Sequence, residues 1–69
     1  MSKAGDVLWE STTQITSVID AMNLAIEKGR IEDAAIHAQR LLALREVQHR
    51  AYMLAPDEER RAWMKNKTK

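Results

Sequence analysis

Apolar residues recur every three or four positions along the first third of the chain. The recurring residues are Leu8, Ile15, Ile19, Met22 and Ile26, with Thr12 in the one polar position. This spacing places them on one face of an α-helix and is typical of a narrow heptad seam. Asp6 is a suitable N-cap, and Gly29 is a suitable residue to follow the last turn. The pattern therefore predicts a helix over residues 6–28 with a single contact face.

A second predicted helix, over about residues 31–55, has apolar residues around most of its circumference. They include Ile31, Ile36, Leu41, Leu42, Leu44, Val47, Met53 and Leu54. Only one strip is consistently polar, and it is marked by Glu32, Gln39, Glu46 and Arg50. Pro56 ends the pattern because proline lacks the N–H that an interior helical residue donates. A helix with so wide an apolar surface must be covered from several sides.

The connection between these helices, residues 28–30, is short enough to force them to lie antiparallel and adjacent. One antiparallel neighbour covers a single stripe of the second helix, so we expect a second copy of the chain to cover the rest. The prediction is an all-α helical hairpin with a short C-terminal helix, homodimerising into a four-helix assembly. The expected core and dimer contacts are Leu8, Ile15, Ile19, Met22, Ile26, Leu41, Leu44, Val47 and Leu54.

After Pro56 the sequence predicts a third helix over about residues 57–65. Proline suits the first helical position, the acids Asp57 to Glu59 suit the first turn, and basic residues follow. A helix this short is unstable alone. We expect Trp63 and Met64 to dock it, either onto the body of the protein or onto a partner. Residues 66–69 form a predicted basic tail.

Composition adds a reason to expect oligomerisation. The chain has 69 residues, enough for a single domain (1–69), and it has no cysteine. A core of this size supplies only about 3–5 kcal/mol, and disulfides cannot supplement it. The sequence shows no signal-peptide pattern and no stretch of the roughly 20 apolar residues that would span a bilayer, so we expect a soluble, cytoplasmic protein.

The sequence contains no pattern typical of an enzyme or a cofactor site. It lacks a glycine-rich phosphate loop, a nucleophile elbow and a cysteine nucleophile. His37 and His49 are about 120° apart around the second helix, so they cannot form a same-face ligand pair. Glu46 and His49 have the spacing of half a di-metal motif, but the first helix offers no matching inward glutamate. We therefore expect no catalysis, no cofactor and no metal.

Several aromatic and basic residues remain after the core is assigned. Arg45, His49 and Tyr52 are spaced by four and three residues and share one side of the second helix. Arginine, tyrosine and tryptophan most often anchor protein interfaces. We expect a protein partner to contact Arg40, Arg45, His49, Tyr52, Trp9 and Trp63. The alternative is that the cations pair with Asp20 or Glu27 at the edge of a dimer, while the tryptophans complete a small core.

Nucleic acid is a second possible partner class, although the net charge of +1 does not favour it. The arginines of the second helix are Arg40, Arg45 and Arg50. Steps of five residues rotate successive side chains by about 140°, so these three diverge instead of forming a stripe. A nucleic-acid-binding dimer would have to use Arg60, Arg61 and the lysine-rich tail. Nucleic acid is therefore the less expected partner.

Three resemblances follow from these features. Residues 28–35, continuing to 41–46, resemble the helix-turn-helix of FliT-type flagellar export chaperones and loosely one tetratricopeptide unit. The length and two-helix layout are similar to those of the plasmid RNA-binding protein Rop. In size, helical layout and general sequence character, the whole chain most resembles the small phage-encoded quorum-sensing anti-activators. That resemblance implies a dimeric inhibitor in the host cytoplasm that binds a LuxR-type transcription regulator and, as a further target, a pilus assembly ATPase. It transfers no functional residue by position.

Overall fold

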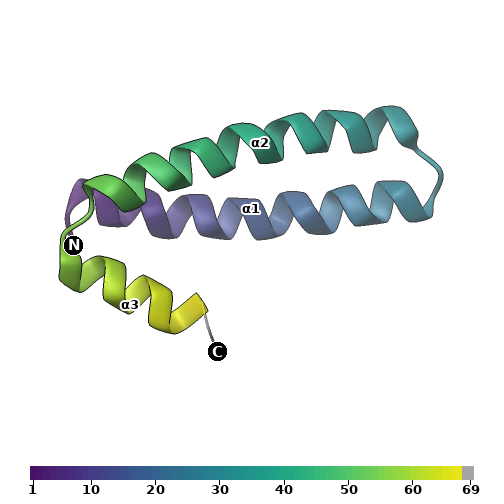
Figure 1. Cartoon of the computed structure of the whole chain (residues 1–69). Coiled ribbons are helices and arrows are strands. Elements are labelled where there is room, and N and C mark those ends of the chain that lie inside the picture. Colours follow the sequence, from purple (N-terminus) through teal and green to yellow (C-terminus); the bar gives the residue numbers. More distant parts are fainter. Residues whose placement is uncertain (68–69) are drawn as a thin grey trace.

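The computed structural model describes residues 1–67 and is all-helical over that range. Helix α1 spans Lys3–Glu27, α2 spans Ile31–Leu54 and α3 spans Asp57–Lys67. Helices α1 and α2 form a long antiparallel hairpin, and α3 folds back beneath the open end of the hairpin (Figure 1). The all-α class and the helical hairpin predicted from the sequence are confirmed.

Helix α1 begins three residues earlier than the predicted start at Asp6. Its N-cap is Ser2, whose Oγ accepts a hydrogen bond from the Gly5 N–H at 3.0 Å. Asp6 instead lies in the first turn, where its negative charge favours the positive end of the helix dipole. Serine and aspartate are both good capping residues, so residue type alone did not decide between the two positions.

The turn between α1 and α2 is built as the sequence predicts. Gly29 has a positive φ of 71°, which L-residues with a side chain rarely adopt. The Gly29 N–H donates to the Ile26 carbonyl at 3.0 Å, and the Arg30 N–H donates to the Ala25 carbonyl at 2.8 Å. This pair of bonds is the Schellman arrangement, which satisfies the last carbonyls of α1. The chain can therefore reverse within a few residues.

The face of α1 that packs against α2 is centred about one residue before the predicted seam. Its buried residues are Gly5, Leu8, Ser11, Val18 and Ala25. Ile15 and Met22 of the predicted seam are half-buried, whereas Ile19 and Ile26 are exposed. Small side chains at Ser11 and Ala25 let the two helices approach closely, and this close approach fixes which of two adjacent heptad positions points inward.

Helix α2 buries little of its apolar surface. Its only buried residues are Ala34 and Ala51, and Leu41 and Leu44 are half-buried. The other two predicted core positions, Val47 and Leu54, are exposed in the single chain. The helix ends at Leu54, just before Pro56, as the proline predicts. The wide apolar surface expected from the sequence is thus largely uncovered within residues 1–67.

Helix α3 begins at Asp57, with Pro56 outside the helix. The Pro56 carbonyl accepts the first helical hydrogen bond, from the Arg60 N–H at 3.0 Å. Pro56 therefore lies immediately before the first helical residue, whereas the sequence pattern predicted it at the first helical position. The helix continues to Lys67, two residues beyond the predicted end, so it includes part of the predicted tail. Residues 68 and 69 lie outside the described residues.

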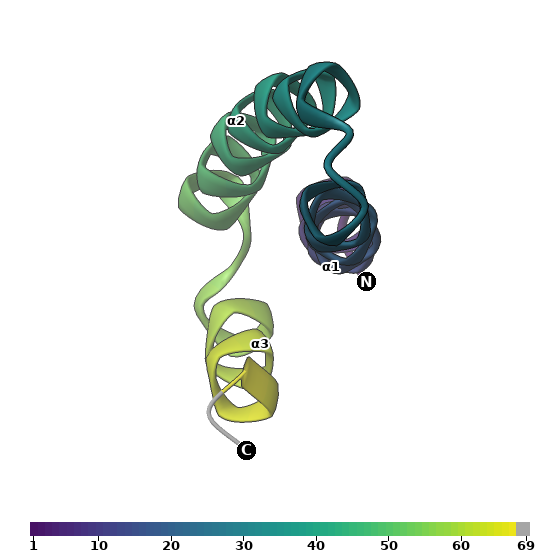
Figure 2. The same cartoon turned by 90° about the vertical axis from the view of Figure 1, so that its right-hand side faces the viewer.

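The small hydrophobic core joins all three helices. Leu8 of α1, Ala51 of α2, Ala55 and Trp63 of α3 form one buried cluster, flanked by partly buried Ala4, Trp9 and Tyr52. Trp63 is only 5% exposed, so α3 is part of the body of the protein. The end-on view shows α3 on one side of the hairpin (Figure 2). We call this side the α3 flank.

Candidate protein-binding groove

The contacts that hold α3 against the hairpin include two sets of hydrogen bonds. In the first, the Ser2 N–H and Oγ both donate to Oε1 of Glu59, at 2.8 and 3.1 Å. Gly5 leaves room for this carboxylate, because a Cβ at that position would collide with the Glu59 carboxyl group. Ser2, the N-cap residue of α1, therefore also binds α3 through Glu59.

The second contact is centred on the hydroxyl of Thr12. Thr12 Oγ1 accepts hydrogen bonds from Trp63 Nε1 at 2.8 Å and from Gln48 Nε2 at 3.0 Å. The same hydroxyl donates to the Leu8 carbonyl at 2.7 Å. One side chain thus links α1, α2 and α3. Thr12 occupied the single polar position in the predicted seam, and this network is the reason that a polar residue fits there.

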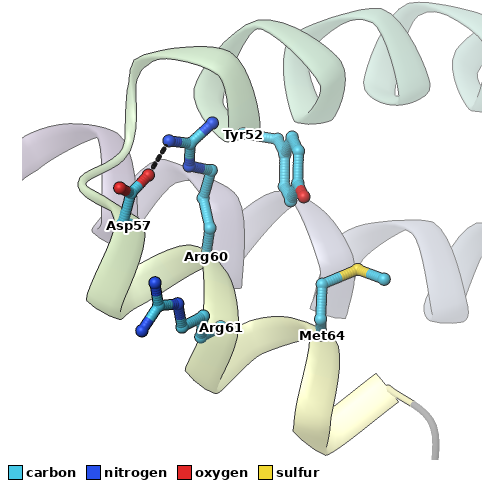
Figure 3. Close-up of a pocket in the computed structure, with 5 residues that line it drawn as sticks. All are labelled: Tyr52, Asp57, Arg60, Arg61 and Met64. Atoms are coloured by element: carbon cyan, nitrogen blue, oxygen red, sulfur yellow. Dashed lines mark hydrogen bonds and ion pairs between the residues drawn. The ribbon is translucent and has the colours of Figure 1, made fainter.

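Docking of α3 creates a groove between α3 and the second half of α2. It consists of two adjoining hollows that share Tyr52 and Met64. One hollow, of about 430 Å³, is lined by Tyr52, Asp57, Arg60, Arg61 and Met64 (Figure 3). The other, of about 300 Å³, is lined by Arg45, Gln48, His49, Tyr52, Trp63 and Met64. We call the two together the α2–α3 groove.

The centre of the groove is aromatic and apolar. The rings of Tyr52 and Trp63 have centroids 5.6 Å apart and planes inclined at 59°, a tilted aromatic pair. Met64 lies beside Tyr52 with its thioether extended from α3 (Figure 3). Methionine is unbranched and polarisable, so it adapts to differently shaped partners. The groove therefore offers an adaptable apolar contact between more rigid rings.

The walls of the groove are basic. The Arg60 guanidinium lies 5.7 Å from the centre of the Tyr52 ring and pairs with the Asp57 carboxylate. Arg45 and Arg61 are exposed and make no ion pair with another described residue. Asp57 is the single acid lining the groove, and it is already paired. The groove thus presents two unpaired guanidinium groups around an apolar centre.

Helical spacing explains why these side chains meet. Arg45, His49 and Tyr52 each follow an inward-facing residue of α2 by one position, which rotates them by about 100° onto the α3 flank. On α3, Asp57, Arg60, Arg61 and Met64 are spaced by three, one and three residues. This spacing places them on one face of that helix.

The structure gathers four of the six predicted partner contacts at the groove: Arg45, His49, Tyr52 and Trp63. Trp63 is buried, so its indole lies at the base of the groove and contributes little exposed surface. Arg40 is exposed but lines neither hollow, and Trp9 packs against the core cluster. Sequence reasoning did not place Arg60, Arg61 and Met64 beside Tyr52, because that requires knowing how α3 folds back.

The remaining candidate chemistry is sparse. No group of three or more His, Cys, Asp or Glu side chains in residues 1–67 is placed to hold a metal ion. Oε1 of Glu46, the acid of the Glu-x-x-His spacing, lies 3.7 Å from Nη2 of Arg50 on the exposed surface. No helix within the same range has the length and apolar character needed to cross a membrane.

Comparison with known proteins gives no relative from which a function could be transferred. No protein-family model, curated protein or solved structure matches this chain significantly.

Proposed function

We propose that this protein is a protein-binding inhibitor that works as a homodimer. The observation that carries the proposal is the uncovered apolar surface that extends from the middle of α2 to the hairpin tip, away from α3. Ile19 and Ile26 of α1 and Ile31 and Leu42 of α2 are all exposed there, Ile31 to 69% and Leu42 to 70%. We call these four residues the tip patch. Apolar side chains gathered in this way mark interaction surfaces.

The four residues of the tip patch share the α3 flank. Ile19, Ile26 and Leu42 each follow an inward residue by one position, a rotation of about 100°. Ile31 precedes the buried Ala34 by three positions, which places it about 60° round to the same side. Because α1 and α2 are antiparallel, equal rotations on the two helices lead to the same side of the hairpin. Thr12 and Tyr52, which contact Trp63, occupy equivalent positions at the other end. Burial of the tip patch by a second copy would complete the four-helix core.

The dimer is tested by sedimentation of the purified chain at micromolar concentration. We expect the wild type to sediment as a dimer and Leu42→Glu and Ile26→Glu to sediment as monomers, because each introduces a charge into the apolar contact. Leu42 is exposed in the single chain, so its substitution removes nothing from the hairpin's own core. Gln39→Glu, in the polar strip, is the matched control. A folded wild-type monomer would contradict the proposal.

The inhibitory target that we propose is a LuxR-type transcription regulator, with a pilus assembly ATPase as a further target. The α2–α3 groove supports protein capture because it joins aromatic and arginine side chains, the types that carry most interface energy. Co-expression with such a regulator should give a stoichiometric complex and loss of transcription from a regulated reporter promoter. If the regulator does not copurify with the wild-type chain, the proposal fails.

A nucleic-acid-binding dimer is the alternative, and it rests on Arg60, Arg61 and Lys65 of α3. Its support is weaker, because Arg60 is already paired with Asp57. Counterion release would make such binding strongly dependent on salt. A mobility-shift assay at low salt with duplex and single-stranded probes separates the two functions.

A further inference from the structure

We infer that the α2–α3 groove receives an acidic amphipathic helix of the partner protein. This inference rests on the proposed protein-binding function and adds the chemistry of the segment that is bound. Its first support is charge. The groove is lined by Arg45, His49, Arg60 and Arg61, and its one acid, Asp57, is paired with Arg60. A segment carrying carboxylates complements this surface, whereas a basic segment is repelled.

The second support is the combination of charge with an apolar centre. Tyr52 and Met64 belong to both hollows and separate the unpaired guanidinium of Arg45 from that of Arg61. A bound segment must therefore place apolar side chains over Tyr52 and Met64 and carboxylates on either side. A helix does so naturally, because its apolar stripe is flanked by polar positions. A groove formed by two packed helices is a recurrent site for such a segment.

The ring contacts within the groove favour a peptide over nucleic acid. Binding of single strands uses aromatic faces on which bases stack. Here the Tyr52 ring is already engaged by Trp63 at 5.6 Å and by the Arg60 guanidinium at 5.7 Å. Trp63 is itself buried. The groove therefore presents the edges of aromatic rings and the Met64 thioether, and it lacks an open ring face on which a base could stack. Ring edges and a thioether contact aliphatic side chains well.

The experiment is a fluorescence-anisotropy titration of the full-length protein with three labelled probes. The first is a helical peptide with a leucine stripe flanked by glutamates, and the second has lysine in place of every glutamate. The third is a single-stranded oligonucleotide. We expect the acidic peptide to bind at least about tenfold more tightly than the lysine peptide, with affinity falling as salt is added. Tighter binding of the oligonucleotide in the same buffer would overturn the inference, as would no binding of the acidic peptide.

Charge-reversal variants assign the binding to the groove. Arg45→Glu and Arg61→Glu lie on opposite walls, and each should weaken binding of the acidic peptide by about fivefold or more. Arg40→Glu is the matched control, because Arg40 is an exposed arginine of α2 that lines neither hollow. It should change the affinity less than twofold, or about the error of the method. An equal effect of Arg40→Glu would show attraction by overall charge and would overturn the inference.

The same variants separate this inference from the proposed function. If the LuxR-type regulator copurifies equally well with wild type, Arg45→Glu and Arg61→Glu, the groove is not its docking site and only the inference fails. If the regulator does not bind the wild type, the proposed function fails, whatever the peptide titration gives.

Discussion

At the scale of single residues, two small residues of α1 contribute to the docking of α3. The Thr12 hydroxyl accepts from Trp63 and Gln48 and donates to the Leu8 carbonyl, so its hydrogen-bonding capacity is fully used. Gly5 contributes through the absence of a side chain, since the Glu59 carboxylate occupies the space that a Cβ would fill. The sequence showed the first as a polar interruption of the seam and gave no role to the second.

Replacing Thr12 by valine keeps the side-chain shape and removes the hydroxyl. The donors of Trp63 and Gln48 would lose their acceptor, so we expect the free energy of unfolding to fall by about 1–3 kcal/mol. Urea unfolding followed by tryptophan fluorescence measures the loss. Thr16→Val is the control, because its exposed hydroxyl bonds only the Thr12 carbonyl of the same helix, at 3.2 Å. Equal losses in the two variants would contradict the three-helix role of Thr12.

The effect of Gly5→Ala on thermal stability should change sign when the Glu59 carboxylate is removed. Alanine is the better helix former by up to about 1 kcal/mol. In the wild-type background, however, the new methyl group displaces the Glu59 carboxylate and should lower thermal stability. In a Glu59→Ala background the collision is absent, so the same substitution should raise stability. A stabilising effect in both backgrounds would rule out the proposed steric conflict.

At the scale of elements, local signals end the helices and long-range contacts place α3. The left-handed Gly29 and the break at Pro56 were both predicted, because each acts through the backbone of its own residue. Docking of α3 depends instead on Trp63 and Glu59, whose partners Thr12 and Ser2 are 51 and 57 residues away in the chain. No local pattern reveals such contacts.

An alanine at Gly29 tests the turn between α1 and α2. Space is not the limit there, since nothing lies within 4 Å of a Cβ built at this position. The backbone conformation is the limit, and a left-handed alanine should cost about 1–2 kcal/mol. Gly29→Asn should cost less, because asparagine tolerates this conformation. Chemical denaturation of the three proteins checks this order, and equal stabilities would contradict it.

Trp63→Ala tests whether α3 depends on its buried anchor. Helix α3 has only 11 residues, so it should not persist without tertiary support. We expect the amide hydrogens of α3 to exchange at nearly unprotected rates while the hairpin keeps its protection, as measured by hydrogen exchange with mass spectrometry. Met64→Ala, at a more exposed neighbouring position, should leave α3 protected. Loss of α3 protection in that control would show that α3 unfolds after any truncation of its side chains and does not depend on Trp63 in particular.

At the scale of the whole molecule, the described core is small for the chain that it must hold. Leu8 is the one large side chain among residues 1–66 that is fully buried. The exposed tip patch and the marginal stability of a domain this small both favour association. If the folded state is a dimer, association stabilises it by mass action. The midpoint of thermal unfolding should then rise with protein concentration in the wild type and stay constant in Leu42→Glu.

The sequence by itself determined the helical class, the hairpin turn at Gly29 and the break at Pro56. These features arise from hydrogen bonds and backbone angles within about one helical turn, so neighbouring residues suffice to predict them. Only the tertiary structure decided that Ser11, Val18 and Ala25 face inward while Ile19 and Ile26 do not. It also decided that α3 docks on Thr12 and Ser2 to form the groove. Both depend on packing between residues that are distant in the chain. Two adjacent heptad positions can be equally hydrophobic in the sequence, and only contact with a neighbouring helix determines which of them is buried.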